Sequence, residues 1–130
     1  MKIANITVRV IKELTGYSAT AMIGTNFIAS EAETFEELKT GILESLNLTF
    51  EDRDIPYTIN DICFEYDLES FFDFYKVINA KALSERIGMN QSLLAQYIRG
   101  IKKPSPKQTN RILLGVQQIG KELTEVRFLL

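Results

Sequence analysis

Apolar and polar residues alternate along three short stretches near the start of the chain. The first runs from Ala4 to Val10, the second from Tyr17 to Ile23 and the third from Phe27 to Ser30. A two-residue period places one side of each stretch in a core and the other in water, which is typical of half-buried β-strands. Turn residues at Gly16 and Gly24 separate the stretches, so the pattern predicts an antiparallel meander.

The period then changes to that of a helix. Thr34 is followed three residues later by Glu37, the spacing of a capping box. Apolar residues recur behind this start at helical spacing, at Phe35, Leu38, Ile42 and Leu46. After a polar stretch, alternation returns from Ile62 to Leu68 and predicts a fourth strand. We therefore expect residues 1–68 to form a small βββαβ domain.

From Glu69 onward the apolar spacing is helical throughout, and no linker rich in Gly, Pro or Ser marks a boundary. The sequence thus predicts an α+β protein in which an all-α domain occupies residues 69–130. Its last helix is expected from about Ser105 to Leu123, with one apolar face made of Ile112, Leu113, Val116, Ile119 and Leu123.

The segment from Ala80 to Arg99 fits a helix-turn-helix register. Such a pair of helices needs apolar residues where the helices meet, and these are Leu83, Ile87, Met89, Leu94 and Tyr97. Ser84 is small at the expected crossing point, and Gly88 permits the tight turn. Asn90 is suited to cap the second helix.

The second helix of this pair carries the candidate DNA-reading residues. Its first turns present short or amide side chains, which pair well with base edges in the major groove, and we expect this role for Asn90, Gln91, Ser92 and Gln96. Basic residues follow directly and are expected to bind phosphate, namely Arg99, Lys102, Lys103 and Lys107. Lys81 and Arg86 are secondary candidates. Leu93 is an unexpected leucine on the predicted solvent side.

Charge supports the same division of the chain. Residues 1–67 hold five Lys or Arg against twelve Asp or Glu, a net charge of −7, whereas residues 68–130 hold ten against five, a net charge of +5. Between Lys76 and Arg111 there are eight basic residues and one acidic residue, Glu85. A local excess of this size can bind phosphate although the whole chain carries −2.

Several kinds of chemistry are excluded or not expected. The chain has no histidine and one cysteine, Cys63, which rules out the usual zinc clusters, an internal disulfide and Ser-His or Cys-His nucleophilic pairs. No metal, cofactor or catalytic residue is predicted. The absence of a long apolar run or of a signal-peptide core leads us to expect a cytoplasmic protein without membrane contact.

The segment from Glu69 to Leu123 resembles the Cro and phage-repressor (XRE-type) helix-turn-helix family. The residues that carry the resemblance are Leu83 to Met89, Gln91-Ser92 and the run Gly100-Ile101-Lys102-Lys103-Pro104-Ser105, which looks like the loop after the recognition helix. The resemblance implies a sequence-specific regulator that binds an operator in double-stranded DNA as a homodimer or larger oligomer.

The first half resembles the antitoxin domain of the HicB family, which has a partial RNase H-like fold. This rests on Gly16-Tyr17-Ser18-Ala19, on the helix start Thr34-Phe35-Glu36-Glu37 and on the order of the domains, although Ile28 to Glu31 replaces a proline and glycine pair seen in many members. The resemblance implies that the protein neutralises a small basic RNase toxin and represses its own operon.

Three alternatives stay open at this point. The protein could be a free-standing repressor whose first domain senses a ligand or only oligomerises. The two helices around Gly88 could form a plain bundle. A nuclease could use Asp61, Glu65 and Asp67, which share one face of the fourth predicted strand with Cys63, but alternation alone explains a polar face. Most aromatic residues from Phe71 to Tyr75, and most of the apolar segment Val126–Leu130, are expected in the core. The other uses are a contact with the first domain or a second subunit for the aromatic residues, and an edge strand or a dimer contact for the terminal segment.

Overall fold

The computed structural model describes residues 6–130, which form two compact units that divide between Phe74 and Tyr75. The first unit contains a sheet of four strands and the second contains helices alone. The predicted α+β class is therefore confirmed. Ala4 and Asn5, at the start of the first predicted strand, lie outside the described residues.

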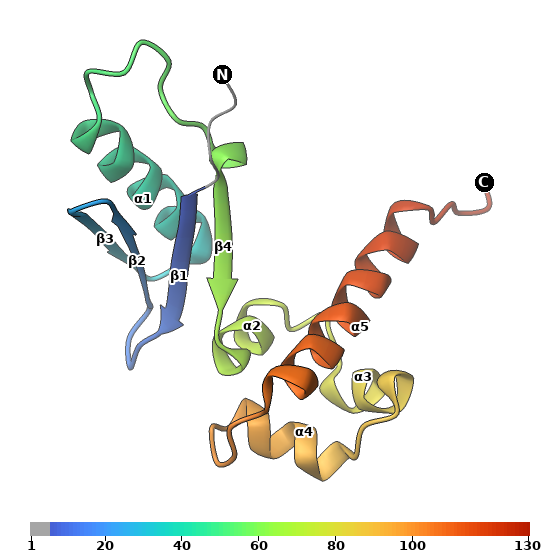
Figure 1. The fold of residues 1–130 in the computed structure, drawn as a ribbon. Helices are drawn as coiled ribbons and strands as arrows, with labels where there is room; N and C mark the ends of the chain where they lie inside the picture. The colour runs from blue at the N-terminus through green and yellow to red at the C-terminus, as the bar shows by residue number, and fades with distance from the viewer. Residues whose placement is uncertain (1–5) are drawn as a thin grey trace. The chain divides into compact units, whose positions relative to one another are not determined.

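The sheet has the strand order β3-β2-β1-β4. Its first three strands are β1 (Ile6–Lys12), β2 (Tyr17–Ile23) and β3 (Asn26–Ala32), which pair antiparallel as the predicted meander. Strand β4 (Ile62–Tyr66) lies parallel to β1 on its other side. A parallel neighbour requires a crossover connection, and the helix between β3 and β4 supplies it (Figure 1).

Helix α1 (Phe35–Thr49) covers one face of this sheet (Figure 1). The Thr34 hydroxyl accepts a hydrogen bond from the Glu37 backbone N–H at 3.2 Å, which confirms the predicted helix start. The buried residues of the helix recur at helical spacing and meet the inward residues of the strands, with Leu38, Ile42 and Leu46 on the helix side. Among the described residues of this unit, no helix covers the other face of the sheet (Figure 1).

Helix α2 (Leu68–Phe74) belongs to the first unit, so our boundary at residues 68 and 69 needs correction. The buried Ser70 hydroxyl accepts a hydrogen bond from the Lys12 backbone N–H at 2.7 Å, and Asp73 accepts from the Tyr17 hydroxyl. The Phe74 ring lies 4.2 Å from the Tyr17 ring, centroid to centroid. These contacts join the helix to β1 and β2, which a helical period in the sequence could not reveal.

The second unit contains three helices, α3 (Ala80–Ile87), α4 (Gln91–Ile98) and α5 (Pro106–Thr124). Each begins with a side chain that accepts a backbone N–H: Asn79 from Ala82, Asn90 from Leu93 and Ser105 from Gln108. The core of the unit consists of Leu83, Met89, Leu94 and Ile112, which are buried. Three of these were predicted core residues of the helix pair, and the predicted Ile87 and Tyr97 are half-buried.

Two expectations for apolar residues of this unit are wrong. Leu113 and Leu123 are 48% and 62% exposed, although the predicted apolar face of α5 includes both of them with Ile112. Successive helical residues point about 100° apart, so Ile112 turns inward and Leu113 turns outward. The segment Val126–Leu130 was expected in the core, but all five residues are exposed and lie outside any helix or strand.

Candidate nucleic-acid interface

The turn between α3 and α4 fixes the direction in which the second helix starts. Gly88 has a φ of 68°, in the left-handed region that glycine adopts without strain. Its N–H donates to the Glu85 carbonyl at 3.3 Å, and the Met89 N–H donates to the Ser84 carbonyl at 2.8 Å. This is the hydrogen-bond pattern of a Schellman motif, which ends one helix and turns the chain sharply.

Behind the turn, small and apolar side chains hold α3 and α5 close together. Ser84 is buried and its hydroxyl donates to the Lys81 carbonyl at 2.6 Å, so it needs no partner from another helix. Gly115 on α5 lies where a Cβ atom would come within 2.4 Å of an Ile87 side-chain atom. A close approach of this kind is the reason for glycine at position 115.

Arg111 is a functional candidate that the sequence did not single out. Its Nη2 atom donates to the carbonyl oxygens of Ile87 at 2.9 Å and Gly88 at 2.7 Å, and its Nη1 donates to Gln108 at 3.3 Å. In the sequence it stands out only as the last residue of the basic block Lys76–Arg111. Its role depends on how α5 lies against the turn, for which the sequence carries no local signal.

Three of the predicted base-reading residues lie on helix α4, and they differ in exposure. Gln91 and Ser92 are exposed in its first turn, and Gln96 is half-buried one turn later. Ser92 and Gln96 stand at i and i+4 and so lie on one side of the helix. Within residues 6–130, the side chains of these three residues have no hydrogen-bond partner, so their donors and acceptors are available to a ligand.

Asn90 differs from the other three because its side chain already has a structural role. Its Oδ1 atom accepts the Leu93 N–H at 3.1 Å and caps α4, as predicted. The amide nitrogen is the part left to face a base. Leu93, which we expected to be exposed, is half-buried, since the helix turns it partly towards its own unit.

Basic side chains surround the C-terminal end of α4. Arg99 ends the helix, Lys102 and Lys103 lie in the following turn, and Lys107 lies in the first turn of α5. All four are exposed, and none forms an ion pair within the described part of the chain. The Ile101 and Lys102 N–H groups both donate to the Gln96 carbonyl, at 3.0 and 3.3 Å, which folds this basic turn back against the helix.

The two secondary candidates for phosphate contacts behave differently. Lys81 is exposed and has no ion pair among the described residues. Arg86 forms a 2.6 Å ion pair with Glu122 of α5, and this pairing lowers the pKa of Glu122 below its ordinary value. Arg86 therefore joins α3 to α5, and we remove it from the phosphate-binding candidates.

The three carboxylates that motivated the nuclease alternative differ in their hydrogen bonds and exposure. Asp61, at the end of the short 3-10 helix η1 (Ile59–Asp61), accepts the Thr58 N–H at 2.8 Å, and Asp67 accepts the Ser70 N–H at 2.7 Å. Glu65 and Cys63 are exposed on β4. Among residues 6–130, no three Asp, Glu, Cys or His side chains gather as a group that could hold a metal ion.

The case for a nucleic-acid interface depends on the residues of this chain alone. None of the helices described in residues 6–130 combines the length and apolar character that crossing a bilayer requires. The chain matches no protein-family model, no curated protein and no solved structure.

Proposed function

We propose that the protein is a cytoplasmic, sequence-specific DNA-binding transcriptional regulator. In this proposal α3, the Gly88 turn and α4 act as a helix-turn-helix, and α4 enters the major groove. The observation that carries it is a set of polar side chains on α4, Gln91, Ser92 and Gln96, that have no partner within residues 6–130. Basic residues without an ion pair in the same range follow them, with Arg99, Lys102 and Lys103 after α4 and Lys107 in the first turn of α5.

The two sets of residues would do different work. Glutamine amides can pair with adenine through two hydrogen bonds, and the serine hydroxyl can donate or accept at any base edge. Each good contact of this kind is worth about 1–3 kcal/mol of discrimination between bases. Arg99, Lys102, Lys103 and Lys107 would neutralise phosphates, which raises affinity for every sequence and fixes the position of α4.

The test begins with selection of bound duplexes from a random pool, followed by affinity measurements on the selected and a scrambled duplex. Ser92→Ala combined with Gln96→Ala should lower affinity for the selected duplex at least about tenfold and leave the scrambled duplex unaffected. Gln117→Ala is a matched control, because Gln117 is an exposed glutamine on α5. If wild-type protein binds no duplex at low salt, the proposal is wrong and the second unit is a plain helical bundle.

A second function is proposed for the first unit, namely neutralisation of a small basic RNase toxin, as the HicB resemblance implies. The observation in its favour is the net charge of −7 over residues 1–67, which would attract a basic protein. The open face of the sheet carries exposed Glu31 and Glu65. The alternative is a free-standing repressor in which this unit senses a ligand or only oligomerises.

Co-expression distinguishes these two readings. The short basic protein encoded beside this chain, if there is one, would be produced together with it, and the complex purified and assayed for RNase activity. A stoichiometric, inactive complex that dissociates in high salt supports the antitoxin reading. Separate elution of the two proteins, or the lack of a basic neighbour, supports the free-standing repressor.

A further inference from the structure

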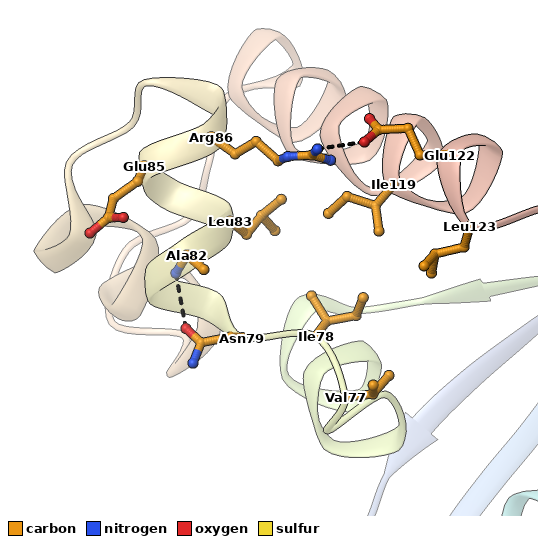
Figure 2. A pocket seen from close by; sticks show the side chains of 10 residues that line it. All are labelled: Val77, Ile78, Asn79, Ala82, Leu83, Glu85, Arg86, Ile119, Glu122 and Leu123. Atoms are coloured by element: carbon orange, nitrogen blue, oxygen red, sulfur yellow. Dashed lines mark hydrogen bonds and ion pairs between the residues drawn. The ribbon is translucent and has the colours of Figure 1, made fainter. Parts of the chain in front are cut away.

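An apolar groove runs between the start of α3 and the last turns of α5 (Figure 2). Its apolar lining includes Leu83 on α3, Ile119 and Leu123 on α5, and Val77 and Ile78 in the segment before α3. The groove has a volume of about 660 Å³, within the range of roughly 300–1,000 Å³ found for pockets that enclose drug-sized ligands. It lies wholly within the second unit.

The same unit ends in an apolar segment that no other part of residues 6–130 covers. After α5 the chain continues outside any helix or strand (Figure 1), and Phe128, Leu129 and Leu130 are 88%, 103% and 124% exposed. We call Val126–Leu130 the tail. Adjacent large apolar side chains that are left in water mark a surface that associates with another.

The tail is poorly placed to enter the groove of its own chain. The Glu125 and Val126 N–H groups donate to the carbonyls of Glu122 and Leu123, at 3.1 and 3.3 Å, so the chain continues the helical turn past the end of α5. Leu123, which lines the groove, comes only a few residues before Phe128. The tail would have to reverse immediately to fill its own groove, whereas a second copy can approach without a reversal.

We propose that the tail of one chain lies in the groove between α3 and α5 of a second copy. Charge fits this occupant. Glu85 lines the groove and has no ion pair in residues 6–130. The tail carries Arg127, whose guanidinium donates to the Val126 carbonyl at 3.1 Å and forms no ion pair within the same residues. Phe128, Leu129 and Leu130 supply the apolar side chains that would fill the groove.

Reciprocity makes the pairing a closed dimer. Each chain brings both a tail and a groove, so two copies related by a two-fold axis bury both tails at once. The Arg86–Glu122 ion pair, which lines the groove in Figure 2, helps to hold α3 and α5 at the separation that the tail would fill. The dimer does not depend on DNA, so it is tested without it.

The first experiment measures the mass of the full chain in solution over a range of concentrations. Wild-type protein should be a dimer, and Phe128→Ser or Val77→Glu should raise its dissociation constant at least about tenfold. Both positions are exposed, at 88% and 87%, so neither change disturbs a core. Leu14→Ser is the control, because Leu14 is an equally exposed apolar residue in the first unit, and this variant should dimerise like wild type.

The second experiment shows which chain supplies the tail. Val77→Cys and Leu129→Cys are made separately, each with Cys63→Ser to remove the exposed native thiol, and the two proteins are mixed and oxidised. A covalent heterodimer is expected, and neither variant alone should give it. Monomeric wild-type protein, or a mixture that gives no covalent heterodimer on oxidation, overturns the proposal.

Discussion

Arg111 and Gly88 are joined by a 2.7 Å hydrogen bond from the guanidinium Nη2 to the glycine carbonyl oxygen. The same nitrogen donates to the Ile87 carbonyl, so one side chain of α5 satisfies two carbonyls at the end of α3. Gly88 is also the residue that redirects the chain into α4. Arg111 therefore helps to fix, from α5, the direction in which α4 starts.

The first prediction concerns this link. Arg111→Lys keeps the positive charge but cannot donate from a planar fork to two carbonyls. Given the proposed function, the variant should lose about tenfold in affinity for the selected duplex and keep the affinity for a scrambled duplex and its salt dependence. Binding measured on both duplexes checks this. Equal losses on both would make Arg111 a phosphate contact instead of a positioning residue.

The second prediction separates the turn from ordinary helix stability. Gly88→Ala places a side chain at a φ of 68° and should cost about 1 kcal/mol or more in the free energy of unfolding. Gly120→Ala is the matched control, because Gly120 lies within α5 and a Cβ there meets nothing within 4 Å. It should stabilise the protein by about 0.5–1 kcal/mol. Urea unfolding of both variants measures the difference, and equal effects would contradict the role of the turn.

The third prediction concerns Tyr17 and Asp73 in the first unit. The hydrogen bond to Asp73, together with burial and the negative charge of that carboxylate, raises the pKa of the Tyr17 hydroxyl. The protonated hydroxyl is the donor, so its contribution is complete below the unfolded pKa of about 10 and is lost as the pH rises through the higher folded pKa.

Tyr17→Phe should therefore lower the free energy of unfolding by about 1 kcal/mol at neutral pH. Above pH 10 the gap between variant and wild type should shrink. Unfolding curves recorded at several pH values measure both effects. No gap at neutral pH would show that the ring contact with Phe74, which the variant keeps, and not the hydroxyl is what stabilises α2. A gap that stays constant as the pH rises above 10 would contradict the role of the protonated hydroxyl as the donor.

The fourth prediction concerns acid conditions. The hydrogen bond from Arg86, with a second from Gln118, lowers the pKa of Glu122 below its ordinary value. A depressed carboxylate pKa stabilises the fold above the unfolded pKa, and this contribution is lost as the pH falls through the folded value. The last turn of α5 should accordingly loosen below about pH 4.

Glu122→Gln tests the sign of this effect. In this variant the part of the acid-induced loss of stability that comes from Glu122 should be absent. Glu125→Gln is the control, because Glu125 is an exposed carboxylate without a partner in the described chain. This variant should lose stability in acid as wild type does. Hydrogen exchange of the α5 amides reports the loosening directly. Identical acid profiles for wild type and Glu122→Gln would refute it.

Much of the fold follows from local pattern. Alternation from Tyr17 to Ile23 predicts the bounds of β2, and the Thr34–Glu37 spacing predicts the start of α1. These features depend on residues close in sequence, whose side chains must share a face or a cap. The predicted cap at Asn90 and turn at Gly88 are confirmed for the same reason.

Features set by distant residues were not predicted. The place of α2 in the first unit depends on Ser70 and Asp73 meeting Lys12 and Tyr17, far apart in sequence. The engagement of Arg86 by Glu122, and of the turn by Arg111, depends on how α5 packs. A sequence shows which side chains are charged, and only the packing shows which of them are already satisfied.

The last prediction uses that distinction between free and satisfied charges. Lys102 and Lys103 are exposed without ion pairs in the described residues, so each is free to displace a counterion from DNA. Replacing both with Gln should reduce the slope of log affinity against log salt by about 1.8, because each neutralised phosphate contributes about 0.9. Discrimination between selected and scrambled duplexes should not change, because phosphate contacts carry no sequence information.

Lys121→Gln is the control for this prediction. It removes an exposed lysine near the far end of α5 and should leave the slope within about 0.3 of wild type. A slope unaltered by the Lys102 and Lys103 changes would mean that DNA does not contact this end of α4.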